Sequence, residues 1–375
     1  MKITAAVLRR AGAAHPYAQS RPLDICEVEL APPGAGEVQI KIHAAGLCHS
    51  DLSVMDGTRL RPLPMALGHE AAGEIVEIGA GVTRFKAGDH VVLVFMPGCG
   101  HCRPCATGRP ALCEPGAEAN NAGTLLAGTR RLSEHGTQLN HHLGVSAFAT
   151  YAVVSEASCV IIDKSLPFDI AALFGCAVLT GVGAVVNTAA AVPGSSMAVI
   201  GLGGVGLSAL LGAGLCGARQ IIAVDTDEAK LALAKTLGAT HAVKAGTPTA
   251  LEEIRALSQG GVDYAFEMAG AVPALEVAYA ATARGGTTIT AGLPAPDRQL
   301  AFQALSLVAA ERTLKGSYMG SCVPVRDIPR YIALYQQGRL AIDRLLTHRL
   351  KLEAINEGFD RLHAGACVRQ VIELS

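Results

Sequence analysis

The sequence predicts an α/β protein with a β-rich domain built from both ends of the chain and a doubly wound parallel sheet inserted between them. Changes of texture along the 375 residues predict this division. Residues 1–177 alternate short β-like runs with glycine and proline turns. Residues 178–317 repeat an apolar strand, a glycine turn and an alanine-rich helix. Residues 318–375 mix one helix with strand-like pieces. Since no linker precedes them, we expect them to fold back onto the first part.

Individual sequence runs support the division of the chain into three parts. The first part contains the strand-like runs EVQIKIHAAGL, AAGEIVEIGAGV, GDHVVLVFMPG and FATYAVVSEASCVII. The middle part contains SMAVIG, VGLSALLGAGLCGA, QIIAVD, DEAKLALAKTLGA and HAVKA, in that order. This βαβαβ series has near-continuous apolar strands, which are typical of a parallel sheet covered on both faces. The last part contains a helix at IPRYIALYQQG and ends in RQVIELS.

Composition narrows the class of protein. Half of the residues are hydrophobic, yet the formal net charge is −1, so there is no electrostatic reason to expect nucleic acid or an anionic membrane as a partner. The N-terminal apolar patch precedes its arginines, whereas a secretory signal has its charge first. No apolar run of membrane-spanning length lacks glycine-rich interruptions. We therefore expect a soluble, cytoplasmic protein.

Four of the eleven cysteines lie in the stretch GCGHCRPCATGRPALC. Cys99, Cys102, Cys105 and Cys113 follow the spacing C-x2-C-x2-C-x7-C. Cysteines three residues apart make strained disulfides, and nothing else indicates an oxidising compartment. Four thiolates on a turn-rich loop suit a closed, tetrahedral structural zinc. An iron–sulfur cluster also takes four thiolates and is the alternative. A second alternative is that these four thiols lie close together in sequence by coincidence and bind no metal.

The run VIGLGGVG carries the pattern G-x-G-x-x-G at Gly201, Gly203 and Gly206, with Gly204 and Val205 inside it. It follows an apolar strand and opens a helix, and Asp225 ends the next strand nineteen residues after Gly206. This context predicts a dinucleotide site with the pyrophosphate at the helix N-terminus. Asp225 can accept both ribose hydroxyls and would repel a 2′-phosphate, which favours NAD over NADP. A simple packing turn is the alternative.

A second set of metal-ligand types lies outside the cysteine-rich loop. GLCHSD offers Cys48, LGHEAAGEIVEIG offers His69 and Glu70, and LFGCAVLTG offers Cys176. Two thiolates and one imidazole would leave the fourth position of a tetrahedral zinc free for a substrate oxygen. Spacing alone cannot bring these residues together. Taken singly, Cys48 and Cys176 are better explained as inert buried thiols, and His69 as a core histidine with satisfied hydrogen bonds.

The whole chain resembles the zinc-dependent alcohol dehydrogenases of the medium-chain dehydrogenase/reductase superfamily. The resemblance is carried by GLCHSD, GHEAAGEIVEIGAGVTRFKAGDHV, CGHCRPCATGRPALC, GCAVLTGVGAVVNTA, VIGLGGVGLSALLGA, VDTDEAKLALAKTLGAT, LKGSYMG and VRQVIEL. It implies a GroES-like catalytic domain at 1–177 and 318–375, with a structural-zinc lobe at about 98–115, and a Rossmann NAD-binding domain at 178–317. It also implies two zinc ions per subunit, the catalytic one on Cys48, His69 and Cys176.

The resemblance assigns further roles. Ser50 corresponds to the hydroxyl that binds the substrate oxygen and accepts its proton. Asp51 corresponds to the acceptor of the second N–H of His69, and Glu70 to an acid that tunes or transiently ligates zinc. His49 stands where relatives contact the pyrophosphate. Ser53 stands where they place a proton-relaying histidine, so the proton would leave through water or through His49.

More distant contacts also follow from the resemblance. The expected cofactor contacts are Thr180, at the nicotinamide, Lys230, near the adenosine ribose, and Arg369, at the pyrophosphate. An ordinary surface charge is an equal alternative for Lys230. The expected substrate pocket is lined by Phe95, His142, Leu293 and Met319. His142 is its one polar member, at a position where relatives usually carry an apolar or aromatic residue.

The implied reaction is hydride transfer from a zinc-bound alkoxide to NAD, which interconverts primary aliphatic or benzylic alcohols and aldehydes. One alternative is the glutathione-adduct formaldehyde branch, which needs a pocket arginine. Arg130 and Arg131 lie near the far end of the lobe, away from where we expect that pocket. The other alternative is an inactive NAD-binding relative. The edge strand in AAERTLKGSYMG predicts a homodimer, with a tetramer possible.

Overall fold

The computed structural model describes residues 1–374 and divides the chain into two compact units. The first unit comprises Met1–Cys176, Val323–Arg330 and the chain from Leu346 onward. The second comprises Ala177–Cys322 and Tyr331–Leu345. Residues 331–345 thus belong to the second unit, whereas the sequence predicted one return to the first part at residue 318. Within the second unit, the Tyr331 hydroxyl lies 3.8 Å from Cys322 Sγ.

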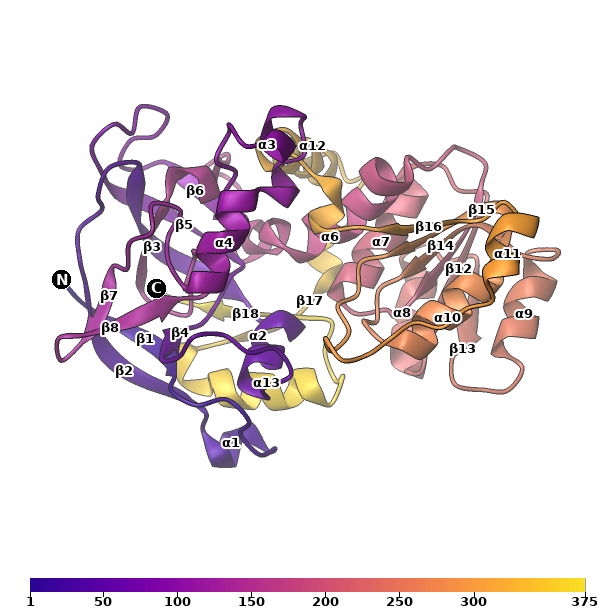
Figure 1. Ribbon diagram of the computed structural model, residues 1–375, viewed down its shortest axis with the longest axis horizontal. Helices are drawn as coiled ribbons and strands as arrows, with labels where there is room; N and C mark the ends of the chain where they lie inside the picture. The colour runs from indigo at the N-terminus through magenta and orange to yellow at the C-terminus, as the bar shows by residue number, and fades with distance from the viewer. Residues whose placement is uncertain (375) are drawn as a thin grey trace. The chain divides into compact units, whose positions relative to one another are not determined.

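The first unit is β-rich and contains two sheets (Figure 1). A closed barrel runs in the order β1 (Lys2–Leu8), β2 (Leu23–Leu30), β7 (Leu132–Glu134), β8 (Thr137–His141) and β4 (Met65–Ala66). The second sheet runs in the order β10 (Cys159–Ile161), β6 (His90–Leu93), β5 (Ala71–Ile78), β3 (Glu37–Gly46), β18 (Arg369–Glu373) and β17 (Leu346–Leu350), and β9 (Tyr151–Ser155) also pairs with β3. Strand β18 lies antiparallel to β3, so the two ends of the chain form one sheet.

Short helices complete the first unit. They are α1 (Tyr17–Ser20), α2 (His49–Met55), α3 (Arg103–Ala106), α4 (Glu114–Ala122), α5 (Phe168–Ala172) and α13 (Ile355–His363). Helix α13 alternates apolar and polar residues at helical spacing and buries Ile355, Phe359 and Leu362 in the core shared with β3 and β5. Helix α12 (Pro324–Gln336) begins in the first unit and ends in the second.

The second unit is built on a six-stranded sheet in which all neighbouring strands are parallel. Its order is β13 (His241–Lys244), β12 (Gln220–Asp225), β11 (Ser196–Ile200), β14 (Val262–Glu267), β15 (Thr282–Thr290) and β16 (Thr313–Gly316). The helices are α6 (Ala177–Gly183), α7 (Gly204–Leu215), α8 (Glu228–Thr236), α9 (Ala250–Leu257), α10 (Val272–Ala281) and α11 (Ala304–Ala309). Every residue of β11 is buried, as its apolar run predicts. The predicted α/β class, with its doubly wound parallel sheet, is confirmed.

The strand order reverses at β11, because β12 and β13 lie on one side of it and β14 to β16 on the other. Ligands of open parallel sheets bind at the carboxyl ends of strands beside such a switch point. The glycine-rich turn after β11 lies at that place. Among the described residues, no single helix is long and apolar enough to cross a membrane. One bent pair, Phe168–Gly175 with Ala177–Ala189, meets the criterion by length and composition alone.

Candidate active site and metal centres

Three potential metal ligands converge in the first unit. Cys48 follows β3 and caps the N-terminus of α2, His69 lies in the turn between β4 and β5, and Cys176 ends the short helix after α5. Gly68 has a φ of +94°, and a side chain there would meet the backbone nitrogen of Phe148 at 2.5 Å. Glycine at this position therefore lets the turn place His69 against the barrel.

The ligand atoms of Cys48, His69 and Cys176 all lie within 4.8 Å of one another, and all three residues are buried. A hydrogen bond from the Cys176 thiol, and then the His69 imidazole, hold the pKa of Cys48 well below its usual value against the cost of burial. A buried thiolate beside a second thiol and an imidazole is the donor set of an open zinc site with three protein ligands. The residues present therefore fit a catalytic zinc.

Asp51 supports His69 at Nδ1. His69 Nδ1 lies 3.0 Å from Asp51 Oδ1, and the backbone N–H of Cys48 donates to Asp51 Oδ2 at 3.2 Å. Asp51 is fully buried, but His69 and His142 outweigh its desolvation and lower the pKa of its carboxyl. An ionised carboxylate can only accept, so it fixes the proton of His69 on Nδ1 and leaves Nε2 free for a metal.

Glu70 forms a buried ion pair with Arg369, the first residue of β18. Within residues 1–374, Glu70 Oε2 has no hydrogen-bond partner, and burial raises the pKa of this carboxyl to about 7 despite the arginine. Gly46 makes room for the pair, because a Cβ there would lie 2.2 Å from Glu70 Oε1. The sequence placed Arg369 at the pyrophosphate and did not reveal its pairing with Glu70, which joins residues 299 positions apart.

Two rings flank His69. Phe95 and His142 each lie edge-on to the imidazole, with centroids 5.5 Å away. His142 is 1% exposed, and its Nδ1 lies 3.1 Å from Asp51 Oδ1. The sequence predicted His142 only as a pocket residue. Its approach to Asp51 could not be predicted, since the two residues are ninety-one positions apart.

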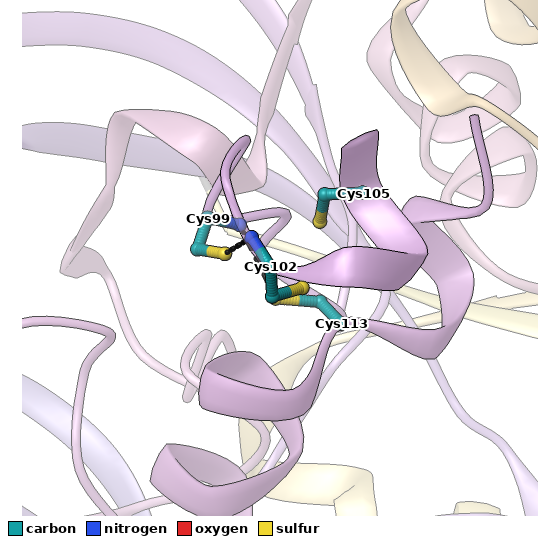
Figure 2. Close-up of side chains that lie close together, drawn as sticks. All are labelled: Cys99, Cys102, Cys105 and Cys113. Atoms are coloured by element: carbon teal, nitrogen blue, oxygen red, sulfur yellow. Dashed lines mark hydrogen bonds between the residues drawn. The ribbon is translucent and has the colours of Figure 1, made fainter. Parts of the chain in front are cut away.

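The four cysteines of the loop also converge (Figure 2). Their sulfurs lie within 4.8 Å of one another, with Cys102 Sγ and Cys113 Sγ 3.9 Å apart. A disulfide needs about 2.05 Å, whereas four thiolates at 2.3 Å around one zinc would be about 3.8 Å apart. The spacing leaves room for one ion rather than for a cluster of several irons, and all four cysteines are free thiols. These residues fit a structural zinc.

Backbone N–H groups support the sulfurs of this loop. Cys102 N donates to Cys99 Sγ, and both Cys99 N and Gly116 N donate to Cys113 Sγ. Although desolvation opposes it, the N–H of Cys102 helps to lower the pKa of Cys99 to about 7. Burial raises the pKa of Cys105 to about 12 and also raises that of Cys113, so of these three cysteines only Cys99 favours the thiolate form that a metal requires.

The glycine-rich turn connects β11 to α7 in the second unit. Gly201 has a φ of +91°, and a Cβ at Gly206 would lie 1.8 Å from the carbonyl oxygen of Gly201. A Cβ at Gly203 would meet nothing within 4 Å, which leaves open space for a ligand at this point. Asp225, at the end of β12, accepts from the backbone N–H of Leu202 at 2.6 Å and of Asp227 at 2.9 Å. This geometry can hold a pyrophosphate at the N-terminus of α7 and a ribose at Asp225.

The remaining predicted residues lie as follows. In the first unit, His49 is exposed and Ser50 is half-buried on the first turn of α2, and Ser53 Oγ donates to the carbonyl of His49. In the second unit, Thr180 is buried in α6, Lys230 is half-buried on α8, Met319 is buried and Leu293 is half exposed.

Comparisons with known proteins agree with this arrangement. Residues 34–164 match the family described as alcohol dehydrogenase GroES-like domain, and residues 204–337 match zinc-binding dehydrogenase. An alcohol dehydrogenase zinc-binding domain protein from Burkholderia ambifaria is 37% identical, with a TM-score of 0.94 over 100% of this chain and 99% of that one. Benzyl alcohol dehydrogenase from Acinetobacter calcoaceticus is 35% identical, with a TM-score of 0.93 over 100% of both chains.

A more distant likeness is to a short chain alcohol dehydrogenase from E. coli CFT073 that was solved with NADH. It is 21% identical, with a TM-score of 0.80 over 99% of both chains. At this identity the likeness concerns the fold alone.

Proposed function

Because this chain belongs to the zinc-binding alcohol dehydrogenases of the medium-chain dehydrogenase/reductase superfamily, we propose that it interconverts primary alcohols and aldehydes with NAD. One observation carries this proposal: two thiols and one imidazole, far apart in sequence, meet in one buried site. Benzylic substrates are favoured by the likeness to the Acinetobacter benzyl alcohol dehydrogenase at 35% identity. Aliphatic primary alcohols are the second substrate class.

Cys48, His69 and Cys176 would hold the catalytic zinc. When bound, zinc supplies a Lewis acid that makes an alcohol hydroxyl more acidic, and NAD supplies the acceptor for the hydride. Asp51 keeps the His69 proton on Nδ1, 3.0 Å from its carboxylate. Ser50, two residues after Cys48, would hydrogen-bond the substrate oxygen and accept its proton. In the absence of a histidine at Ser53, that proton leaves through water or through His49.

The ion pair of Glu70 and Arg369 would adjust the charge behind the zinc. Glu70 Oε2 is buried without a partner in the described part of the chain, so this carboxylate has one unused acceptor in reach of the charge of Cys48. Its thiolate neighbour Cys48 raises the pKa of Glu70, and Arg369 lowers it, after the larger effect of burial. Transient ligation of the metal by Glu70, and contact of Arg369 with the pyrophosphate, both remain part of the proposal.

Cofactor binding would use the second unit. The open space at Gly203 suits a pyrophosphate, and the Asp225 carboxylate suits the two hydroxyls of an adenosine ribose. A 2′-phosphate would meet the negative charge of Asp225, which supports NAD over NADP. Thr180 and Lys230 are the further proposed contacts.

The glutathione-adduct branch is disfavoured by the two lobe arginines. Arg130 donates to Asn140 Oδ1 at 2.9 Å and to the Ala122 carbonyl at 2.8 Å. Arg131 pairs with the buried Glu37 at 2.7 Å. Both guanidinium groups are therefore used inside the lobe and barrel. An inactive relative is disfavoured because the three zinc ligands, Ser50 and the glycine turn are all present.

We also propose a homodimer that pairs two copies through β16. Among the described residues this strand is the last in the parallel sheet, so no further strand pairs with its outer edge. Nearby apolar side chains support an interface: Leu305 and Val308 on α11 are 67% and 75% exposed, and Phe302 is 42% exposed. Large exposed apolar residues in a cluster are typical of protein–protein contacts.

A substrate panel tests the proposed function. Benzyl alcohol, ethanol and longer primary alcohols are each assayed with NAD and with NADP. In a separate assay, formaldehyde is offered with NAD in the presence and in the absence of glutathione. We expect NADH formation with benzylic and aliphatic primary alcohols and no dependence on glutathione. A strict requirement for glutathione, or no turnover of any alcohol by zinc-loaded protein, would contradict the proposal.

A further inference from the structure

Glu267 is a buried acidic residue at the edge of the parallel sheet where the cofactor is proposed to bind. It ends β14 and pairs with Ile200, the last residue of β11 before the glycine-rich turn. The residue is 1% exposed. Burying a carboxylate is costly unless hydrogen bonds satisfy it. The groups that Glu267 contacts therefore show what it holds in place.

The carboxylate of Glu267 binds the segment that follows its own strand and the end of the next strand. Oε1 accepts the backbone N–H of Ala269 at 2.8 Å and of Gly270 at 2.6 Å. Oε2 accepts the hydroxyl of Thr290, the last residue of β15, at 2.6 Å. One side chain thus ties residues 268–270 to the carboxyl ends of two neighbouring strands.

The segment 268–270 packs directly against the glycine-rich turn. A Cβ at Gly201 would lie 2.7 Å from the backbone nitrogen of Ala269, and a Cβ at Gly206 would lie 3.4 Å from Met268 Cβ. Ala269 itself is exposed, whereas Met268 is buried. The segment therefore reaches the surface beside the turn that is proposed to hold the pyrophosphate.

A glycine encloses the same segment from the side of β15. A Cβ at Gly292 would lie 2.2 Å from the backbone nitrogen of Gly270 and 2.7 Å from Glu267 Oε2. Gly270 has a φ of +73°, which favours glycine at that position as well. The position of the segment thus depends on close backbone contacts on two sides and on the carboxylate between them.

We propose that Glu267 is a positioning residue for the cofactor, because it holds the segment 268–270 as one wall of the cofactor site. Ligands of doubly wound sheets bind at the carboxyl ends of the strands at the switch point. Strand β12, which carries Asp225, lies on one side of β11, and β14 lies on the other. A wall that is already ordered spares the cofactor the cost of ordering it. The inference rests on the proposed function, since it takes the cofactor to be a nicotinamide dinucleotide.

Two substitutions separate the reach of this side chain from its charge. Glu267→Asp keeps the charge but is one methylene shorter, so it cannot contact both backbone N–H groups and Thr290. Glu267→Gln keeps the length and an oxygen that accepts the two N–H groups, and its amide can donate to the Thr290 hydroxyl. If Glu267 acts by position, Glu267→Gln retains the cofactor affinity that Glu267→Asp loses.

Asp263 provides a matched control on the same strand. It is the second residue of β14, and its Oδ2 accepts the backbone N–H of Ser196 at 2.7 Å and the Ser196 hydroxyl at 2.8 Å. Ser196 begins β11, so these bonds lie at the end of the strands remote from the glycine-rich turn. Asp263→Ala should lower the melting temperature and leave cofactor affinity unchanged.

Calorimetric titration with NADH and with NADPH measures the dissociation constant for the wild type and the three variants, and the melting temperature is recorded for each. We expect Glu267→Asp to bind NADH about tenfold more weakly, the value of about one hydrogen bond to a charged group. Glu267→Gln and Asp263→Ala should remain close to the wild type. With benzyl alcohol as substrate, the KM for NAD should rise in Glu267→Asp without an equal fall in kcat.

Unchanged NADH affinity in Glu267→Asp would overturn the proposal. An equal loss in Asp263→Ala would do so too, because any loss of stability would then be sufficient, and so would a greater loss in Glu267→Gln than in Glu267→Asp. If the wild type prefers NADPH and its binding follows the same pattern, the proposed choice of NAD fails and the assignment of Glu267 stands. The assignment also stands if cofactor binding follows Glu267 while no alcohol is turned over.

Discussion

Lowering the pH from 7 to 5 should destabilise the β-rich unit through one buried imidazole, His141. This residue ends β8 and is 1% exposed. Its Nε2 accepts the backbone N–H of Arg131 at 3.0 Å, so the folded state needs an unprotonated nitrogen there. Burial, followed by the charges of Arg130 and Arg131 against that of Glu37, lowers the pKa of His141 to about 4.

The sign and size of the effect follow from this value. Because the folded pKa lies below the unfolded value of about 6.5, the unfolded chain takes up a proton first as the pH falls. The stabilisation is fully present above about pH 6.5 and is lost progressively toward pH 4. Between pH 7 and pH 5, proton uptake by the unfolded chain removes about 2 kcal/mol.

Urea unfolding at pH 7 and pH 5 measures this loss in wild type and in His141→Gln, whose amide oxygen can still accept from Arg131. The cysteine sites are identical in both proteins, so their own acid sensitivity cancels in the difference. We expect the wild type to lose about 2 kcal/mol more than the variant. His135→Gln, at an exposed hairpin turn, is the matched control and should behave like the wild type. Equal losses in wild type and His141→Gln would refute the reasoning.

Three further predictions concern the metal, the cofactor and assembly. Cys99→Ala should reduce zinc from two ions to one per subunit and lower the unfolding temperature, because a structural zinc contributes folding free energy. Cys216→Ala should keep both ions, and equal zinc in the two variants would contradict the assignment. The double variant Asp225→Gly with Thr226→Arg should raise the ratio of kcat/KM for NADP to kcat/KM for NAD by about tenfold or more. The reason is that a repulsive charge is removed and a cation is added. An unchanged ratio would show that Asp225 does not select the cofactor. Val308→Asp should shift the protein from dimer to monomer in light scattering at micromolar concentration, and a wild type that is already monomeric would exclude the β16 interface.

Local patterns were sufficient to predict the parallel sheet. The apolar run of β11, the glycine turn and Asp225 are close in sequence, and each is constrained by backbone geometry that residue type reveals. The path of the chain after residue 318 was less predictable. Helix α12 has one continuous helical pattern, although its two ends belong to different units. Pro329 lies inside the helix, two residues before Tyr331, but a proline does not indicate which unit each end of the helix joins.

The metal ligands required more than spacing. Cys48, His69 and Cys176 are brought together by separate turns, so only the resemblance to a family could group them. Two contacts that depend on tertiary structure were predicted neither from local patterns nor from the resemblance. The approach of His142 to Asp51, and the pairing of Arg369 with Glu70, join β-rich segments that are distant in sequence. Such pairs arise from the packing of strands and turns, which residue types alone do not specify.

The most direct test of the proposed reaction is NADH formation from benzyl alcohol by one protein sample in three states: as purified, after removal of metal by a chelator, and after zinc is added back. We predict turnover in the first state, none in the second and recovery in the third, with Cys176→Ser inactive throughout. An undiminished rate in the metal-free sample, or full activity of Cys176→Ser, would contradict the assignment of a catalytic zinc to Cys48, His69 and Cys176.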